Sequence, residues 1–258
     1  MSAQRPAVPG VPSRAFRSML RNEIRLAFRN PRGLIVGLGL PLVLMVVFGS
    51  RAKFQAPEAQ FGGLSLFDVY LPIIYVFAIS AISLINLPNP LATYREHGIL
   101  RRLSTTPLPT SWVLLAQLTI NVALAVLALV LLVLISHFGF GFPAPQDALA
   151  FVVTSVLSLA ALCALGFVVA AIAPTGSGAY VIGAGVFVVL MFFAGLWLPR
   201  VWMPALLLNI SNYTPLGATV QSFTSALGGA FPPLWALLTL AVWAVAGTLV
   251  ALRIFRWD

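Results

Sequence analysis

Residues 111–136 read SWVLLAQLTINVALAVLALVLLVLIS and contain no charged side chain. A helix needs about 20 mostly apolar residues to cross the hydrocarbon core of a bilayer, and this run is longer than that. Similar apolar runs lie before and after it, at about 33–50, 69–90, 148–173, 179–198 and 232–252. The pattern predicts an all-α integral membrane protein with six transmembrane helices.

The composition supports the same fold class. Of the 258 residues, 60% are hydrophobic and 8% are charged, whereas an ordinary soluble domain has about 25% charged residues. A water-soluble core cannot bury so large a share of apolar side chains. We therefore expect lipid to be the solvent for much of the surface.

The positive charges are distributed unevenly along the chain. If there are six crossings, only three cations lie on one side: Arg51, Lys53 and Arg200. The other side has twelve: Arg5, Arg14, Arg17, Arg21, Arg25, Arg29, Arg32, Arg95, Arg101, Arg102, Arg253 and Arg256. The positive-inside rule then places both termini and residues 93–110 in the cytoplasm. Because membrane orientation explains the net charge of +9, it does not indicate a nucleic-acid partner.

The segment before the first apolar run has two parts. Residues 1–12 are rich in proline and small side chains, so we expect a disordered tail. Residues 13–30 have arginines, among them Arg21 and Arg25, on one helical face and apolar side chains on the other. This pattern predicts an amphipathic helix in the membrane interface. Glu23 falls on the apolar face, where it either reaches head groups and water or makes a buried contact with another helix or a partner subunit.

The residues needed for most catalytic sites are missing from the sequence. The only lysine, Lys53, is not part of a phosphate-binding loop, so any ATP site must belong to another chain. The two histidines fall on opposite sides of the predicted membrane, and the only cysteine is Cys163. Ser177 between two glycines is not a convincing protease nucleophile, because no histidine occurs in the last three spans. The sequence therefore predicts no enzyme activity, metal site or cofactor in this chain.

Several polar residues lie inside the predicted spans. They include Asn86, Gln117, Asn121 and Ser158. The favoured interpretation is hydrogen bonding between helices, and the alternative is the lining of a substrate path. None of the spans has a carboxylate well inside it, which counts against proton-driven transport.

Residues 95–107, between the second and third spans, read REHGILRRLSTTP. Pro88 and Pro90 just before them predict a break or a kink in the second span. Thr93 and Glu96 have the spacing of a capping box, which predicts the start of a new short helix. That helix would present an apolar stripe surrounded by charge and would end at Pro107.

The segment between the fifth and sixth spans is more apolar than a solvated loop. It predicts two short helices, at about 201–211 and 215–227, separated at residues 212–215. We expect a half-embedded, re-entrant helical hairpin on the outer face of the membrane.

The 95–107 segment resembles the cytoplasmic coupling helix of ABC-2 type transporter permeases, a family that includes antibiotic and drug efflux permeases. That family has a pattern close to R-E-x-G-T-L-x-x-L-x-x-T-P, and this chain departs from it at Ile99. Arg29-Asn30-Pro31-Arg32 and Asn212-Tyr213-Thr214-Pro215 also resemble family elements, although each is weak alone. The resemblance covers nearly the whole chain and implies a single transmembrane domain over residues 13–258.

The resemblance further implies a permease that works as a dimer, with an identical or paralogous copy, in the bacterial cytoplasmic membrane. Each copy would bind an ABC-type ATPase subunit that carries ATP and magnesium. Leu100 and Leu103 would be the apolar anchors of the coupling helix. Its charges and turn would come from Arg95, Glu96, Gly98, Arg101 and Arg102, while Glu23, Arg21 and Arg25 belong to the interface helix.

The expected cargo is hydrophobic or amphipathic: a drug, an antibiotic or a lipid-like molecule. Export of a polysaccharide or another envelope polymer is an alternative within transport. A membrane scaffold or immunity protein that transports nothing is an alternative of another class. An adjacent gene for an ATPase would favour the exporter, and an adjacent glycosyltransferase cluster would favour the polymer.

Overall fold

A computed structural model describes residues 21, 33, 35–99 and 111–254 of the protein. These residues form helices and their connections, and within them no strand occurs beyond one isolated bridge, Pro57 to Ser65. The all-α prediction is therefore confirmed. The expected tail at 1–12 and nearly all of the expected interface helix at 13–30, including Glu23 and Arg25, lie outside the described residues. Arg21 is described and is exposed.

Among the described residues, five helices are long and apolar enough to cross a membrane. Their bounds are Leu66–Glu96, Trp112–Gly139, Ala148–Ile172, Gly176–Ala194 and Leu234–Ile254. The first predicted span is shorter in its described part, where π-helix η1 (Ile35–Gly39) continues into α3 (Leu40–Gly49). At about 1.5 Å per residue it is roughly 22 Å long. The order of apolar helices therefore follows the sequence prediction, with five of them long enough to cross the membrane.

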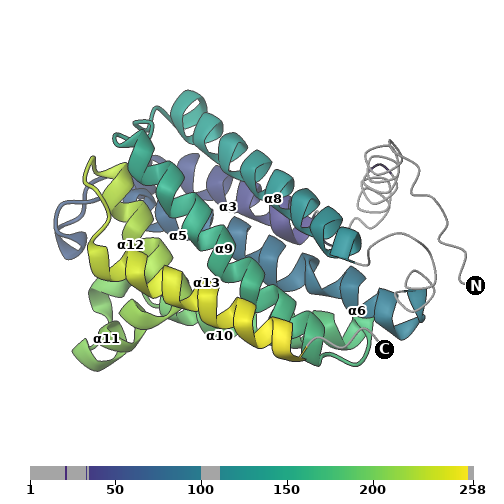
Figure 1. Ribbon diagram of the computed structural model, residues 1–258. Helices are drawn as coiled ribbons and strands as arrows, with labels where there is room; N and C mark the ends of the chain where they lie inside the picture. The colour runs from purple at the N-terminus through teal and green to yellow at the C-terminus, as the bar shows by residue number, and fades with distance from the viewer. Residues whose placement is uncertain (1–20, 22–32, 34, 100–110, 255–258) are drawn as a thin grey trace, which may run out of the picture.

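The second span lies at the centre of the bundle (Figure 1). It is built from α5 (Leu66–Ala81), π-helix η3 (Ile82–Asn86) and α6 (Pro88–Glu96). In its most apolar stretch 83% of the residues are buried, compared with 22% in α13 (Leu234–Ile254). The other helices around it are α8 (Ser111–Leu134), which continues into η4 (Ile135–Gly139), α9 (Ala148–Ile172) and α10 (Gly176–Ala194). The outer helices instead present leucine and valine side chains to the surroundings.

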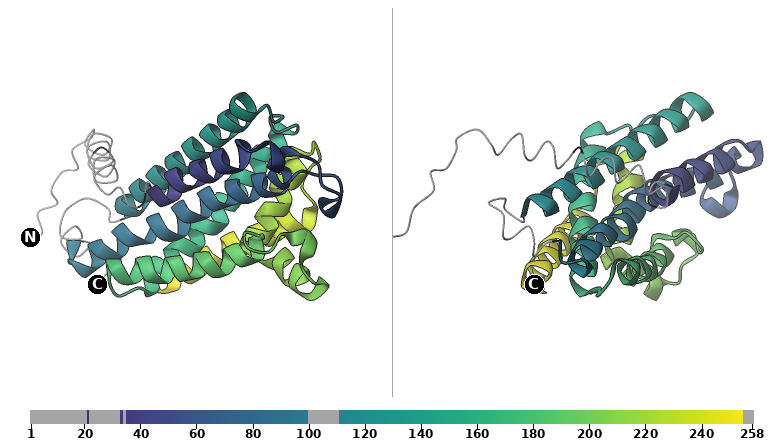
Figure 2. Two further views of the ribbon diagram at one scale, coloured as in Figure 1. Left: turned by 180° about the vertical axis from the view of Figure 1, so that it is seen from behind. Right: turned by 90° about the vertical axis from the view of Figure 1, so that its right-hand side faces the viewer.

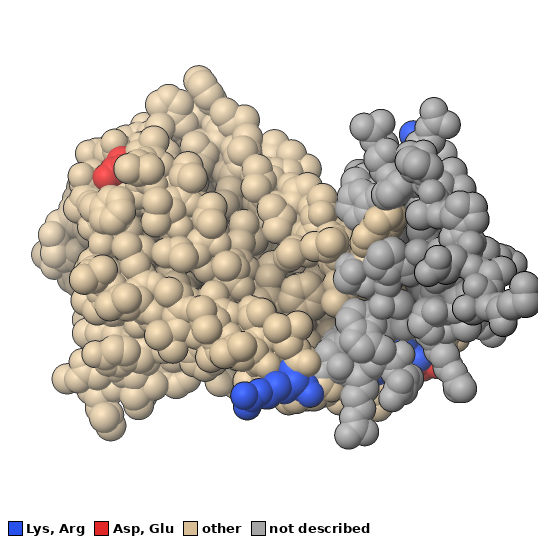
Figure 3. Space-filling view, viewed as in Figure 1, with Lys and Arg blue, Asp and Glu red and all other residues tan. Residues whose placement is uncertain are grey.

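Figure 3 shows one face of the molecule, and its broad middle has no charged side chain. Exposed apolar residues of α8, α9 and α13, such as Val130, Val156 and Val242, are consistent with a lipid-facing surface. Lipid would solvate these side chains at no cost, whereas water would not.

Pro88 and Pro90 do not break the second span, which runs from Leu66 to Glu96, and the predicted capping box at Thr93 is wrong. The π-helical turn at Ile82–Asn86 closes with a bond from the Leu87 N–H to the Ile82 carbonyl (3.0 Å). It allows Pro88 and Pro90 to fall in the first turn of α6, where no N–H donor is needed. Thr93 lies inside α6, and its hydroxyl donates to the Asn89 carbonyl (2.9 Å).

The two short helices predicted between the fifth and sixth spans are present, whereas their half-embedded position on the outer face stays a prediction. They are α11 (Ala205–Tyr213) and α12 (Pro215–Leu227), and Thr214 caps α12 by accepting from the Gly217 N–H (3.1 Å). Most of α12 is buried, whereas α11 is largely exposed. The hairpin lies at the opposite end of the bundle from α6 (Figure 1).

Arg200 holds the hairpin from the short 3-10 helix η5 (Arg200–Trp202). Its guanidinium donates to the Ser211 hydroxyl and to the Asn212 side-chain oxygen (2.6 Å). The Ser211 hydroxyl in turn donates to the Phe193 carbonyl at the end of α10 (2.5 Å). Burial lowers the pKa of Arg200 from its ordinary value. Nearby, Trp202 stacks on Phe61 of the outer η2 turn (Ala59–Phe61), with ring centroids 5.2 Å apart.

The topology can be tested by cysteine labelling in a variant in which Cys163 is replaced by alanine. Gln60 and Ala230 are exposed at the predicted outer end, whereas Ser177 is exposed at the predicted inner end. Cysteines at Gln60 and Ala230 should react with an impermeant maleimide in intact cells, and a cysteine at Ser177 should react only after lysis. Labelling at Ser177 in intact cells would contradict the orientation that the arginine distribution predicts.

Candidate functional site

The end of α6 lies beside the short turn that joins α9 to α10 (Figures 1 and 2). Two of the predicted coupling residues, Arg95 and Glu96, are the last two residues of α6. Each makes a hydrogen bond to the turn between α9 and α10, nearly 80 residues later in the chain. Because these contacts join three helices at one end of the bundle, this cluster is the candidate functional site.

Arg95 binds the end of α9. Its guanidinium donates to the Ala171 carbonyl (2.9 Å) and to the Ala173 carbonyl. The last carbonyls of a helix have no partner within the helix, and they carry the negative end of its dipole. The cation therefore satisfies two terminal acceptors and has the favourable sign.

Glu96 binds the start of α10. Its carboxylate accepts a hydrogen bond from the N–H of Gly176, the first residue of that helix (2.9 Å). Thr175 completes the cap by accepting from the Gly178 N–H (3.0 Å). A carboxylate at a helix N-terminus again has the favourable sign. Two adjacent residues of opposite charge thus bind opposite helix poles on the two sides of one turn.

The backbone of the turn also packs tightly on α6. The Asn89 side-chain amide donates to the Gly176 carbonyl (3.1 Å). A Cβ atom on Gly176 would lie 2.0 Å from the Thr93 hydroxyl oxygen, so only glycine fits without a shift. Asn89, Thr93 and Glu96 are spaced by four and three residues and therefore share one face of α6.

Gly98 follows this cluster in the chain. Its φ of +64° lies in the left-handed region that favours glycine, and its N–H donates to the Arg95 carbonyl (3.0 Å). It ends α6 as a C-terminal glycine commonly does. The predicted anchors Leu100 and Leu103, with Arg101 and Arg102, lie outside the described residues, so their role stays a prediction.

A polar cavity of about 620 Å³ lies between the second span and α10. Its lining is Gly33, Ile85, Asn86, Asn89, Thr93, Glu96, His97, Gly176, Ser177, Tyr180 and Val181. Its volume falls within the range of about 300–1,000 Å³ for small-molecule sites. The Glu96–Gly176 contact borders this cavity, because both residues line it.

Of the four residues predicted as a candidate substrate path, only Asn86 borders this cavity. Asn86 donates to the Asn121 side-chain oxygen (3.1 Å), and Asn121 donates to the Gln117 carbonyl (2.8 Å). Gln117, Asn121 and Ser158 are buried between helices. The Asn86–Asn121 bond supports the interpretation that polar residues join helices here.

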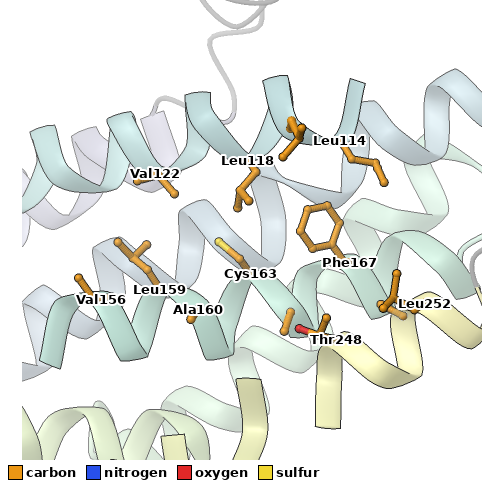
Figure 4. Close-up of a pocket in the computed structure, with 13 residues that line it drawn as sticks. Leu114, Leu118, Val122, Val156, Leu159, Ala160, Cys163, Phe167, Thr248 and Leu252 are labelled. Carbon is orange, nitrogen blue, oxygen red and sulfur yellow. The ribbon is translucent and has the colours of Figure 1, made fainter. Parts of the chain in front are cut away.

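A second cavity, of about 560 Å³, lies among α8, α9 and α13 (Figure 4). Leu118, Phe167 and Leu252 point into it, and Cys163 lies on α9 at its floor. Its only hydroxyl, on Thr248, already donates to the Ala244 carbonyl (2.7 Å). The lining therefore suits hydrocarbon and offers no chemistry. Within the described ranges, no three histidine, cysteine or carboxylate side chains are placed to hold a metal ion.

Sequence reasoning missed the contribution of Asn89, Thr93 and the α9–α10 turn to the site. Residues 174–178 drew attention only for Ser177 between two glycines, not for the contacts that this turn makes. One signal in the sequence could have indicated these contacts. The link is only five residues long and contains a threonine cap and two glycines, a combination that requires a tight turn or the close approach of another helix.

The comparison with known families agrees with this architecture. A family model described as "ABC-2 type transporter" matches residues 14–227. A comparison with curated proteins found no match. The matched range contains the interface segment, the site at the end of α6 and the outer hairpin. The chain is therefore a multi-pass membrane protein of the ABC-2 type transporter family, and it is the permease component of a transporter.

Proposed function

We propose that this chain is the permease subunit of an ATP-driven exporter in a bacterial cytoplasmic membrane. An ABC-type ATPase would bind ATP and magnesium, because the sequence has no phosphate-binding loop of its own. A second permease copy would complete the transport path. The observation that carries the proposal is the end of α6, where the Arg-Glu-x-Gly segment that resembles a coupling-helix pattern joins three spanning helices.

The proposed cargo is a hydrophobic or amphipathic compound, such as a drug, an antibiotic or a lipid-like molecule. The five described spanning helices contain no charged residue in their middle. The polar cavity beside Asn86 is of a suitable size for a small molecule. A polyanionic polymer would need cationic side chains, and no arginine or lysine lines this cavity.

The coupling assignment predicts a large effect of charge at two leucines beyond α6. Leu100→Asp or Leu103→Asp should reduce co-purification of the ATPase by about tenfold or more, because anchor residues at interfaces contribute about 2 kcal/mol or more. The measurement is co-purification from cells that express both subunits, followed by ATP turnover in proteoliposomes. Leu64→Asp is the matched control, since Leu64 is exposed at the other end of the bundle.

The wild-type permease without its ATPase should hydrolyse no ATP. Normal co-purification and turnover with both leucines changed would contradict the coupling assignment. Cargo class is decided in the same vesicles, by ATP-dependent uptake of a hydrophobic dye compared with a labelled oligosaccharide. Uptake of the oligosaccharide alone would contradict the proposed cargo.

A further inference from the structure

We propose that Arg95 and Glu96 are positioning residues that fasten the α9–α10 turn to α6, so that the cytoplasmic ends of α6, α9 and α10 move together. The inference rests on the proposed function, in which an ATPase displaces the segment that follows Gly98. It goes further than that function, because it says how the displacement reaches α9 and α10, which contain no coupling motif.

The first step is the position of the pair in the chain. Arg95 and Glu96 are the last helical residues before Gly98 ends α6. A force on the segment beyond Gly98 therefore acts first on the helical turn that contains them. Rigid helices transmit such a displacement along their axis, whereas a flexible loop would absorb it.

The second step is the direction in which the two side chains reach. Arg95 binds the last carbonyls of α9, and Glu96 binds the first N–H of α10. Each contact is a hydrogen bond to a charged group, which is stronger than a neutral one. Because the bonds are made to main-chain atoms, they hold the helix ends themselves rather than side chains that can change rotamer.

The third step is the packing between the same elements. Asn89 donates to the Gly176 carbonyl, and Gly176 fits against Thr93 with no room for a Cβ atom. Farther along the same span, a Cβ on Gly183 would lie 2.0 Å from the Leu84 carbonyl oxygen. The second span and α10 are thus in backbone contact at two levels, so relative sliding would break close packing.

One member of the pair, Glu96, also lines the polar cavity. Gly176 lines it too, on the opposite element. If α6 and α10 move together, this part of the cavity keeps its width while the ATPase works. If they separate, the same part opens. The two alternatives predict opposite effects of a covalent link between α6 and the turn.

The test is a disulfide between cysteines at Thr93 and Gly176, in a variant with Cys163 replaced by alanine. A Cβ on Gly176 would lie 3.2 Å from the Thr93 Cβ, close to the roughly 3.5–4.5 Å of a disulfide. The cross-linked permease, assembled with its ATPase in proteoliposomes, should transport dye at the same rate before and after reduction. Inhibition by the disulfide that is relieved by a reductant would overturn the proposal.

The complementary test removes the two side chains. Arg95→Ala with Glu96→Ala should lower the dye transported per ATP hydrolysed by about fivefold or more, measured on complexes that contain equal amounts of permease and ATPase. The Thr93–Gly176 disulfide should restore coupling in this variant, which a loss of folding would not allow. Glu96→Gln should retain more coupling than Glu96→Ala, because an amide oxygen still accepts from Gly176.

Arg253→Ala is the matched control, since Arg253 is exposed at the same end of the bundle. It should leave transport per ATP unchanged. Normal coupling in the double alanine variant would also overturn the proposal. By contrast, absence of ATPase binding or of transport by the wild-type chain would refute the proposed function itself, so the two failures are distinguishable.

Discussion

Replacing Gly183 with alanine is expected to destabilise the protein severely. A Cβ atom at this position would lie 2.0 Å from the carbonyl oxygen of Leu84 and 3.1 Å from its carbonyl carbon. Leu84 belongs to the π-helix at the centre of the bundle, so the clash is with backbone and no side-chain rotation relieves it. Overpacking of this kind costs about 1–3 kcal/mol and occasionally more.

Gly185→Ala is the matched control on the same helix. Nothing lies within 4 Å of a Cβ atom at Gly185, and alanine is more favourable than glycine in a helix by about 1 kcal/mol. This variant should be as stable as the wild type or more so. The stability of both variants is measured as the midpoint of thermal unfolding of the purified protein in detergent. The midpoint is taken from the loss of the monodisperse peak on heating. Equal midpoints for the two variants would show that α10 and the π-helix are not in backbone contact.

The spanning helices could be predicted from the sequence because lipid imposes a simple rule. Backbone polar groups must be satisfied within each apolar segment, so long apolar runs become helices whatever their neighbours are. This accounts for residues 111–136 and for the order of the apolar helices. The outer hairpin was predictable for a similar local reason, since Thr214-Pro215 is both a cap and a first-turn proline.

The second span could not be predicted in the same way. Pro88 and Pro90 are strong local signals of a break, and Thr93 with Glu96 is a strong local signal of a helix start. Both fail because the turn at Ile82–Asn86 is π-helical, and its wider hydrogen bonding places the prolines where no donor is required. No local pattern in residues 82–86 specifies that turn. Glycines of α9 and α10 pack closely against the carbonyl groups of this π-helical turn. The residues around the turn therefore come from distant segments of the chain.

The site was predicted in its residues but not in its contacts. Arg95 and Glu96 were expected in the coupling helix, a role that stays a prediction, and the structure shows both bonded from α6 to the ends of α9 and α10. Their partners are nearly 80 residues away, and a sequence pattern does not reveal which helix ends meet. The buried Asn86–Asn121 bond has the same origin, since each asparagine alone was compatible with a helix contact or a substrate path.

The outer hairpin gives the second large expected effect. Gly217→Ala would place a Cβ atom 2.0 Å from the Ser211 carbonyl oxygen and 2.6 Å from its hydroxyl oxygen. The same hydroxyl accepts from Arg200 and donates to the Phe193 carbonyl. Moving Ser211 to relieve the clash would therefore leave a partly buried guanidinium short of a partner. We expect a loss of about 1–3 kcal/mol from overpacking, with more from the broken hydrogen bonds.

Gly228→Ala is the matched control at the other end of α12, because its nearest neighbours would be 3.5 Å away, an ordinary contact. Hydrogen exchange of α11 and α12 separates a local effect from a global one. Gly217→Ala should raise exchange in the hairpin first, since its contacts hold α11 and α12 to the end of α10. Protection equal to that of Gly228→Ala, with the same thermal midpoint, would show that the Arg200–Ser211–Phe193 connection does not hold the hairpin in place.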